Sequence, residues 1–562
     1  MKYLVNVFLL LLMTALTVSA QENGKVQRMM EMEQYNKAKS LLKENLKSAN
    51  TAENWYLLGK VYVKQAKADS ARYCFSMIEK ADPKSNLVQV GKAITATIDG
   101  KNAEALAILD KTRKVASSAK EVETLLAVAE TMVMAGDSAN WPEVLADASQ
   151  IEKKSITPYL VGAKLYSFLA DKYNHPLYYG KASGRYEQAL YLRPDNEDAL
   201  TGLSDIYVIT RNFSSAEDKL SAVLTADSSY IPALKSLGEL SYTLGKYDAA
   251  SRTFGRYISL AEYSRKDLAR YINILYFNKE YAKAGELISS MLADDPSNPV
   301  LLRLKGYTSF QLNKDADGLD AMKKFFELRS VVDTNKVIFT DYEYYGRLLG
   351  RTGNDSLGVI NLTKAYEMDT TQTGLLEDIA RMYEKQKKYQ PAVDYFGKFV
   401  DAKEGNVPSA VYFSMGKDYL VLANQTSGTS DSLLRPVHLI QADTAFSRVV
   451  RLSPNSYLGY QWRARVLASL DPETTRGLAK SDYEKTLLVL EQKNDKQKYA
   501  NDLIEAYRYM GYYYYLRFEE AKKVKDEALK EEAKTNSMSY WQKVLGIDPA
   551  NDVAKKALAA LK

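Results

Sequence analysis

Apolar residues recur every three or four positions along most of the chain, and the segments that carry this pattern come in pairs. The clearest pair spans residues 55–83. Trp55, Leu58 and Tyr62 mark one apolar face, and Ala71 and Phe75 mark the next. This period is typical of amphipathic helices. The pattern therefore predicts two antiparallel helices, the second of which ends before a proline at position 83.

The small residue that opens the second helix of a pair returns at a fixed interval. Ala182, Ala216, Ala250, Ala284 and Gly318 are 34 residues apart in each case. One helix pair cannot bury its apolar face alone, so neighbouring pairs must stack. The sequence predicts an all-α solenoid of about thirteen or fourteen antiparallel helix pairs. Units outside the regular series lie at residues 35–38, 91–103, 125–148, 346–358, 380–396, 415–454, 462–483 and 510–549.

Small residues and prolines predict how each pair is packed and ended. Helix axes approach to about 8–10 Å only where the side chains between them are small. We therefore expect first-helix glycines to face small second-helix residues such as Ala71, Ala250 and Ala392. The glycines concerned are Gly59, Gly238, Gly306, Gly346, Gly416 and Gly511. The prolines expected to end second helices are Pro83, Pro194, Pro296, Pro454 and Pro549.

The pattern W-x2-L-G-x2-Y at residues 55–62, followed by Ala71, Phe75 and Pro83, resembles the tetratricopeptide repeat (TPR) family, which has a 34-residue period. The resemblance extends over nearly all of the chain after residue 20. It implies a superhelical solenoid that binds protein partners or peptide segments. It also implies that the second, fifth, ninth and twelfth positions of each first helix line the concave binding surface.

Carried onto this chain, the resemblance implies a partner-binding wall rich in Tyr and Arg, the residue types that most often anchor protein interfaces. Its ninth positions change from acidic, as at Asp171, to basic, as at Lys417. The alternative is that these are ordinary solvated positions. The residues of this hypothetical wall are Tyr242, Tyr276, Arg303, Tyr307, Phe310, Arg347, Arg381 and Lys417.

The sequence divides into a leader and three helical regions. We expect a leader at 1–20, divergent helix pairs at 21–158, a regular array at 159–335 and a second array at 336–562. Two insertions interrupt the last array. The Gly/Ser/Thr-rich residues 423–436 predict a loop, and the Lys/Glu/Ala-rich residues 516–536 predict a projecting hairpin. The end, Asp552–Lys562, predicts a capping helix.

The leader has the layout of a secretory signal peptide. Lys2 precedes an apolar run from Leu4 to about Val18, and the small residues before position 21 form a cleavage site after Ala20. The run is shorter than the roughly 18–20 residues that span a bilayer, and no later segment is apolar enough to do so. No Cys follows the run, so a lipoprotein anchor is not indicated. We expect export to the periplasm, as a soluble protein or one peripherally associated with the outer membrane.

Composition leaves little chemistry to the chain. Lys plus Arg number 76 and Asp plus Glu 70, a net charge of +6 that gives no case for nucleic-acid binding. One cysteine, Cys74, and two histidines, His175 and His438, leave little for metal or acid–base chemistry. Phosphate-loop, dinucleotide, zinc-protease and serine-hydrolase motifs are absent from the sequence. We expect no enzyme, no catalytic residues, no cofactor and no metal.

A short pattern, Asp-[Ser/Thr]-apolar, resembles the acceptor triplet for periplasmic O-glycosylation in some Gram-negative bacteria. At Asp69, Asp137 and Asp355 it stands where a second helix begins, and Asp there also caps free N–H groups. Ser432 lies in the predicted loop, which makes it the candidate glycosylation site.

Together these features predict an exported, non-catalytic TPR scaffold in complexes of the cell envelope. The sequence leaves open whether the groove or the insertions bind the partner. The alternative is a glycan-binding component of an outer-membrane uptake system of the SusD-like class, which also contains TPR helices. Proteins of that class carry a lipidated N-terminal Cys and large insertions, whereas this chain has Gln21 and short insertions.

Overall fold

The computed structural model describes residues 22–332, 337–426, 433–493 and 495–562. Within these ranges every regular element is a helix, which confirms the all-α prediction. No helix in the described ranges is long and apolar enough to cross a bilayer. The predicted leader, residues 1–20, and the candidate glycosylation site Ser432 lie outside the described residues.

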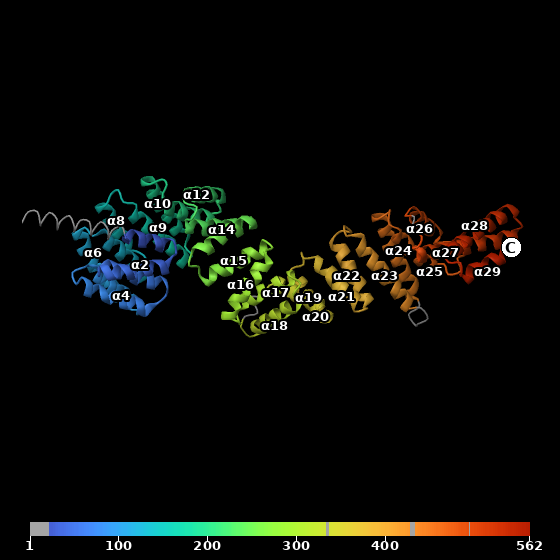
Figure 1. The fold of residues 1–562 in the computed structure, drawn as a ribbon, viewed down its shortest axis with the longest axis horizontal. Helices are drawn as coiled ribbons and strands as arrows, with labels where there is room; N and C mark the ends of the chain where they lie inside the picture. Colours follow the sequence, from blue (N-terminus) through green and yellow to red (C-terminus); the bar gives the residue numbers. More distant parts are fainter. Residues whose placement is uncertain (1–21, 333–336, 427–432, 494) are drawn as a thin grey trace, which may run out of the picture. The chain divides into compact units, whose positions relative to one another are not determined.

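The chain forms two compact units, residues 1–287 and 288–562, and the boundary between them falls within helix α16 (Tyr281–Asp294). Figure 1 shows the order of the helices along the chain. The boundaries predicted at 158 and 335 remain predictions. After helix 22–31, the helices up to that boundary are α2 (Tyr35–Ser48), α3 (Ala52–Lys64), α4 (Ala68–Ala81), α5 (Leu87–Ile98), α6 (Asn102–Ala119), α7 (Val122–Met134), α8 (Trp141–Ile151), α9 (Thr157–Tyr173), α10 (Pro176–Leu192), α11 (Glu197–Ile209), α12 (Phe213–Ala226), α13 (Ile231–Thr243), α14 (Tyr247–Leu260), α15 (Arg265–Phe277) and α16.

The second unit continues with the same alternation of helices. Its helices are α17 (Pro299–Gln311), α18 (Asp315–Val332), α19 (Phe339–Arg351), α20 (Asp355–Met368), α21 (Gly374–Lys385), α22 (Tyr389–Ala402), α23 (Ser409–Gln425), α24 (Leu434–Leu452), α25 (Tyr457–Leu470), α26 (Lys480–Gln492), α27 (Ala500–Val524), α28 (Glu527–Ile547) and α29 (Asp552–Ala560). Consecutive helices pack as pairs, such as α3 with α4 and α27 with α28, and α29 packs on the last pair. This confirms the predicted solenoid of helix pairs.

The turn inside most of the described pairs has one recurring geometry. Gly245 and Gly353 have φ values of 71° and 89° there, a region that glycine enters without a Cβ penalty. The next N–H returns to the first helix, as Lys246 donates to the Ser241 carbonyl at 2.9 Å. This bond satisfies a carbonyl that the helix end would leave open. The same left-handed conformation occurs at Glu33, Ala66, Asn174, Arg211, Lys279, Asn313 and Lys387.

The small residues of the 34-residue series lie in the core. Ala182, Ala216, Ala250 and Ala284 are each 0% exposed, and Gly318 is also buried. Each predicted proline stands two residues beyond the end of a second helix, as Pro83 follows Ala81 of α4. Both predictions are confirmed. The 34-residue spacing of small residues in the sequence is also the spacing of these buried positions in the structure.

The expected partner of the first-helix glycines was wrong. A Cβ atom on Gly59 would lie 2.4 Å from the Phe75 ring, and one on Gly511 would lie 2.8 Å from the Trp541 ring. The glycine thus makes room for a large second-helix side chain and does not face an alanine. Gly238, Gly306 and Gly416 likewise lie against Phe254, Met322 and Phe446. Gly306 and Gly346 come close to a small partner as well, since their Cβ atoms would lie 3.7 Å from the Gly318 carbonyl oxygen and 3.0 Å from the Gly358 carbonyl oxygen.

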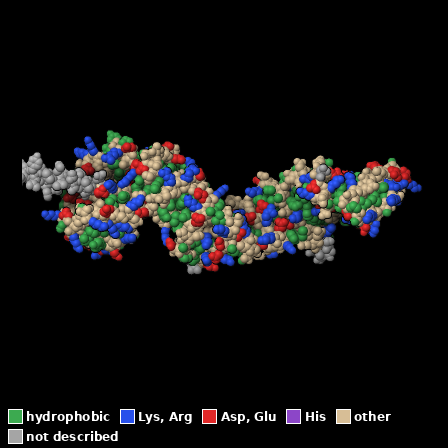
Figure 2. All heavy atoms as spheres, viewed as in Figure 1, with side chains coloured by type: hydrophobic (Ala, Val, Ile, Leu, Met, Phe, Trp, Pro, Cys, Tyr) green, Lys and Arg blue, Asp and Glu red, His purple; other side chains and the backbone are tan. Residues whose placement is uncertain are grey.

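Both insertions lengthen helices. Through residues 516–536 the helices α27 and α28 continue and are joined by Lys525 and Asp526, so this segment forms a helical hairpin. The predicted loop 423–436 is shorter than expected, because α23 runs to Gln425 and α24 begins at Leu434. Its middle, 427–432, lies outside the described residues. On the visible face of each unit, basic and acidic side chains are interspersed (Figure 2).

Candidate protein-binding surfaces

Two residues of the predicted wall, Tyr242 and Tyr276, belong to a half-buried group of rings at the ends of α13 and α15. We define this aromatic cluster as Tyr242, Tyr247, Tyr276 and Phe277. Phe277 is 44% exposed and stacks on Tyr247 with ring centroids 5.2 Å apart. The Tyr242 ring meets Phe277 edge-on at 5.8 Å, and Tyr276 meets it at 5.6 Å. Offset and edge-on rings of this kind form a preformed, partly open apolar surface.

A charged pair borders the aromatic cluster. The Arg270 guanidinium lies 5.2 Å from the Tyr242 ring centroid, and its Nε donates to the Glu239 carboxylate at 3.1 Å. Burial raises the pKa of Tyr242 above its ordinary value. The phenol therefore stays neutral at physiological pH and is available as a hydrogen-bond donor or acceptor.

Three other wall residues, Arg303, Tyr307 and Phe310, contribute to a buried network between α17 and α19. Arg303 donates from Nε and Nη2 to the two carboxylate oxygens of Asp341, both at 2.6 Å. The Tyr307 hydroxyl donates to the same carboxylate at 2.6 Å, and the Asp341 side chain is 0% exposed. The contacts of Arg303 and Tyr307 described here are therefore made within the second unit.

The rings of Tyr307 and Phe310 are 6% and 9% exposed, which contradicts the prediction that they face a partner. Tyr344 stacks on Tyr307 with centroids 4.3 Å apart and meets Phe310 edge-on at 5.2 Å. The Arg351 guanidinium covers Phe310 at 3.6 Å. The physical reason is the next helix pair, whose Tyr344 and Arg351 fill the space that the isolated repeat would leave open.

The remaining wall residues, Arg347, Arg381 and Lys417, form a series of charged contacts in the second unit. Arg347 pairs with Asp378 of the next first helix at 2.9 Å, and Arg381 pairs with Glu377 at 2.7 Å. Lys417 lies over the Phe413 ring, with Nζ 5.9 Å from its centroid. The Arg347 and Arg381 charges that the sequence assigned to a partner are thus largely compensated by neighbouring carboxylates.

Next to Lys417, Asp418 is 2% exposed, and within the described residues its Oδ2 has no hydrogen-bond partner. Burial raises the pKa of Asp418 to about 7, with the Glu384 charge adding to the effect. A carboxyl with this pKa is protonated in about half of the molecules near pH 7, where an ordinary aspartate is ionised.

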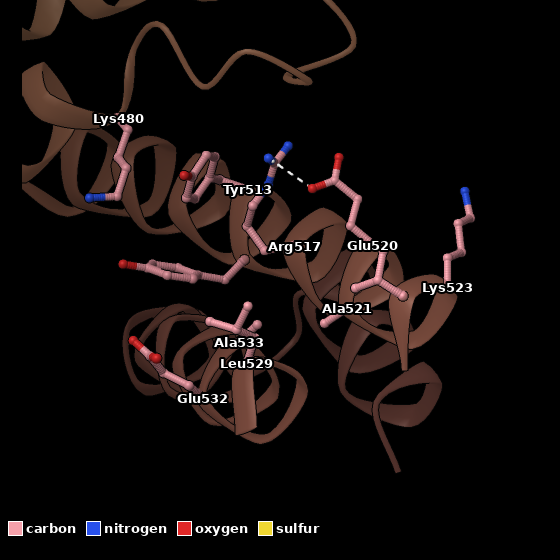
Figure 3. Close-up of a pocket in the computed structure, with 11 residues that line it drawn as sticks. Lys480, Tyr513, Arg517, Glu520, Ala521, Lys523, Leu529, Glu532 and Ala533 are labelled. Atoms are coloured by element: carbon pink, nitrogen blue, oxygen red, sulfur yellow. Dashed lines mark ion pairs between the residues drawn. The ribbon is translucent and has the colours of Figure 1, made fainter. Parts of the chain in front are cut away.

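The projecting hairpin of α27 and α28 holds a hollow of about 580 Å³ (Figure 3). Its floor is apolar, with Ala521, Leu529 and Ala533, and its rim carries the Arg517–Glu520 ion pair at 2.9 Å. Lys480 and Arg517 both lie near the Tyr513 ring, at 5.9 and 5.3 Å from its centroid. The insertion therefore offers a second partly apolar surface with mixed charge at its rim.

Sequence reasoning missed a surface in the first unit, where residues 28–37 lie against the starts of α11 and α13, the end of α14 and Glu262 beyond it. We call residues 28–37 the N-terminal turn. Arg28 donates to Glu197 at 2.5 Å and to Asp227 at 3.4 Å, and its guanidinium lies 4.7 Å from the Tyr230 ring centroid. The Met32 sulfur accepts the Ile231 N–H at 3.4 Å. The residues that meet in these contacts are 169 to 199 positions apart in the sequence, so no local sequence pattern predicts the contact.

Two carboxylates complete this contact from opposite sides. Glu33 accepts the Tyr257 hydroxyl at 2.9 Å, and Lys235 lies 3.6 Å from the Glu33 carboxylate. In return, Glu262 accepts the backbone N–H of Asn36 at 2.7 Å and that of Lys37 at 3.3 Å. Helix α2 has no capping side chain of its own at Gln34, so Glu262 supplies the acceptor that the helix start lacks.

The cysteine and histidines do not form a site. Cys74 is 1% exposed, and burial raises the pKa of its thiol to about 11, which disfavours the reactive thiolate. His175 stands before α10, and His438 is buried in α24 with its ring stacked on Tyr419 at 6.3 Å. Among the described residues, no group of three His, Cys, Asp or Glu side chains is placed to hold a metal ion.

The Asp residues of the triplet pattern differ in their contacts. Asp137 accepts the N–H groups of Ala139 and Asn140 at 2.7 and 3.0 Å, in the turn before α8, and no side chain caps that helix. Asp69 and Asp355 lie in the first turns of α4 and α20 and pair with Arg72 and Lys385. Within the described residues, none of these three Asp side chains makes the predicted capping hydrogen bond.

Comparisons with known proteins give structural neighbours only. No protein-family model matches the chain, and no curated protein matches its sequence. The C-terminal part of a TPR repeat-containing protein from Cytophaga hutchinsonii is 28% identical, covering 52% of this chain and 99% of its own, with a TM-score of 0.38. A TPR protein from Parabacteroides merdae is 17% identical over 46% of this chain and 98% of its own, at 0.30. Yeast Tom70 is 13% identical over 75% and 99%, at 0.28.

The observation that decides the fold is internal to the chain. Paired helices repeat a left-handed turn, and buried small residues recur every 34 positions from Ala182 to Gly318. The chain has the fold of a tetratricopeptide repeat solenoid. In the TPR register of this chain, Lys235 occupies a fifth position, so the contact of the N-terminal turn with Lys235 falls on a position that the family resemblance assigns to the binding surface.

Proposed function

We propose that this TPR protein is an exported, non-catalytic scaffold that binds other proteins in the cell envelope. The observation that supports the proposal most directly is the aromatic cluster with its Arg270–Glu239 border. Tyr and Arg anchors beside an open ring such as Phe277 give a surface where a partner gains affinity from a few residues. TPR helix pairs hold such anchors on a rigid frame.

The test is affinity purification from envelope extract with the Tyr276→Ala/Phe277→Ala variant, followed by mass spectrometry. We expect at least a tenfold loss of the partners recovered with the wild-type protein. Tyr191→Ala is the matched control, because Tyr191 is an aromatic residue of the same unit and is 88% exposed. Unchanged recovery by a variant with an unchanged melting temperature would refute the role of the cluster.

Two further measurements test the cellular setting and the ligand class. N-terminal sequencing of protein taken from the periplasmic fraction is expected to begin at Gln21. Binding of the wild-type protein to a glycan array, lost in the Tyr276→Ala/Phe277→Ala variant, would instead favour the glycan-binding alternative.

A further inference from the structure

The N-terminal turn fills a surface whose chemistry is that of a peptide site. The surface presents two carboxylates, Glu197 and Asp227, and the Tyr230 ring to one guanidinium, that of Arg28. The Tyr257 hydroxyl, together with Lys235, which also pairs with Asp267 at 3.0 Å, suits a carboxylate. Glu262 accepts the free N–H groups of a helix start. Each of these features is contacted by residues 28–37 of the same chain.

The contact is separable from the packing of the first helix pair. Helix 22–31 and α2 share an apolar core with α3, which includes Val26, Ala38 and Leu42, each 0% exposed. The contact with the distant surface has one apolar side chain, Met32, which packs against the cluster that includes Tyr230. Its other contacts are polar, and the Arg28 side chain in it is 41% exposed. Polar contacts between partly exposed groups are weak in water, whereas the apolar core holds the pair together. We therefore expect the contact to open more readily than the first pair unfolds.

We propose that the surface formed by Glu197, Asp227, Tyr230, Lys235, Tyr257 and Glu262 is a binding site for a helical segment of a partner protein. The segment carries an arginine, then a carboxylate about five residues later, and then a helix start. Residues 28–37 are the internal ligand of this site, and a partner binds by displacing them. The inference deepens the proposed scaffold function and rests on it. It concerns a different surface from the aromatic cluster.

The test uses the full-length protein and a fluorescent peptide of residues 22–48, with fluorescence anisotropy as the readout. In the wild-type protein the site is filled, so we expect weak binding. The Arg28→Ala/Glu33→Ala variant frees the site and is expected to bind the peptide at least tenfold more tightly. Adding Glu262→Ala and Asp227→Ala to that variant is expected to abolish the gain. Lys25→Ala is the matched control, because Lys25 lies on the same helix and pairs only with Glu22 at 2.5 Å.

Hydrogen exchange and circular dichroism test whether the variant has lost the contact of the N-terminal turn while remaining folded. The amides of Asn36 and Lys37 are expected to exchange faster in the Arg28→Ala/Glu33→Ala variant while its helix content is unchanged. Equal peptide binding by wild type and variant, or no binding by a folded variant, would overturn the site. Neither result bears on the aromatic cluster, whose variants are tested separately, so failure of this site and failure of the scaffold function are distinguishable.

Discussion

The charged side chains of the two units differ in how far along the chain their partners lie. In the second unit, Arg303 and Arg347 pair with the next helix pair, 38 and 31 residues away. The first unit has such neighbouring pairs too, as Lys235 pairs with Asp267 at 3.0 Å, but it adds contacts with the N-terminal turn, across separations such as 169 residues between Arg28 and Glu197. A neighbouring repeat is a fixed part of the stack, whereas a remote segment can be exchanged. This added set of remote contacts is the reason why we propose an exchangeable binding site in the first unit.

The largest test of this contrast is Asp341→Ala in the second unit. Arg303 and Tyr307 would lose the buried carboxylate that both contact, and removing one member of a buried pair costs about 3–5 kcal/mol. We expect a loss of that size in the free energy of unfolding, measured by urea denaturation. A loss below about 1 kcal/mol would mean that the network is solvated, and the contrast between the units would fail.

A smaller effect is expected from Asp418→Asn. The pKa of Asp418 is about 7 in the folded protein, above the ordinary value of 3.8, so the folded state holds the proton more tightly. Wild-type stability should therefore fall as the pH rises between those two values, and the full cost is present above pH 7. We expect the variant to be more stable than wild type by about 1–3 kcal/mol at pH 8 and nearly equal to it at pH 4, by thermal melting. The same difference at both pH values would contradict this.

In the first unit, Glu262→Ala removes the acceptor for the start of α2. Loss of a helix cap costs about 0.5–2 kcal/mol. We expect faster hydrogen exchange at Asn36 and Lys37, and no change in the second unit. Asp248→Ala is the control, because Asp248 is an exposed acidic residue of the same unit that pairs with Arg252 on its own helix. Unaltered exchange at Asn36 would show that the contact of the N-terminal turn is not formed in solution.

The smallest effect is expected for Arg381→Ala. Its pair with Glu377 is an exposed pair one helical turn apart, and such pairs contribute about 0.3–0.5 kcal/mol. Urea denaturation at low and high salt should show a difference from wild type that nearly vanishes at high salt. A salt-independent loss above about 2 kcal/mol would place Arg381 among the core residues, with Arg303.

The sequence predicted the architecture because the residues that define each repeat lie close together in the chain. The 34-residue series from Ala182 to Gly318, the prolines after second helices and the helix-forming residues 516–536 all act within one or two turns of helix. The same pattern predicted that glycines permit close packing, but not that a ring such as Phe75 fills the space beside Gly59. That choice depends on three-dimensional packing between helices.

The site was predicted less well for a related reason. Tyr307 occupies a ninth position of its repeat, which the TPR resemblance assigns to the open concave surface. In the structure it is buried, because the Tyr344 ring of the next helix pair stacks on it. The N-terminal turn was not predicted at all, because Arg28 and Glu33 meet partners that no period connects to them. Pairings between distant repeats require coordinates.

The buried position of Cys74 has a practical consequence. It is the sole thiol of the chain, it is 1% exposed, and it shares its apolar core with Val26 and Ala38 of the first pair. A maleimide or disulfide reagent can reach the sulfur only when that core opens transiently. The rate at which the unmodified protein is labelled therefore measures how often its first repeats open. No cysteine has to be introduced for this measurement.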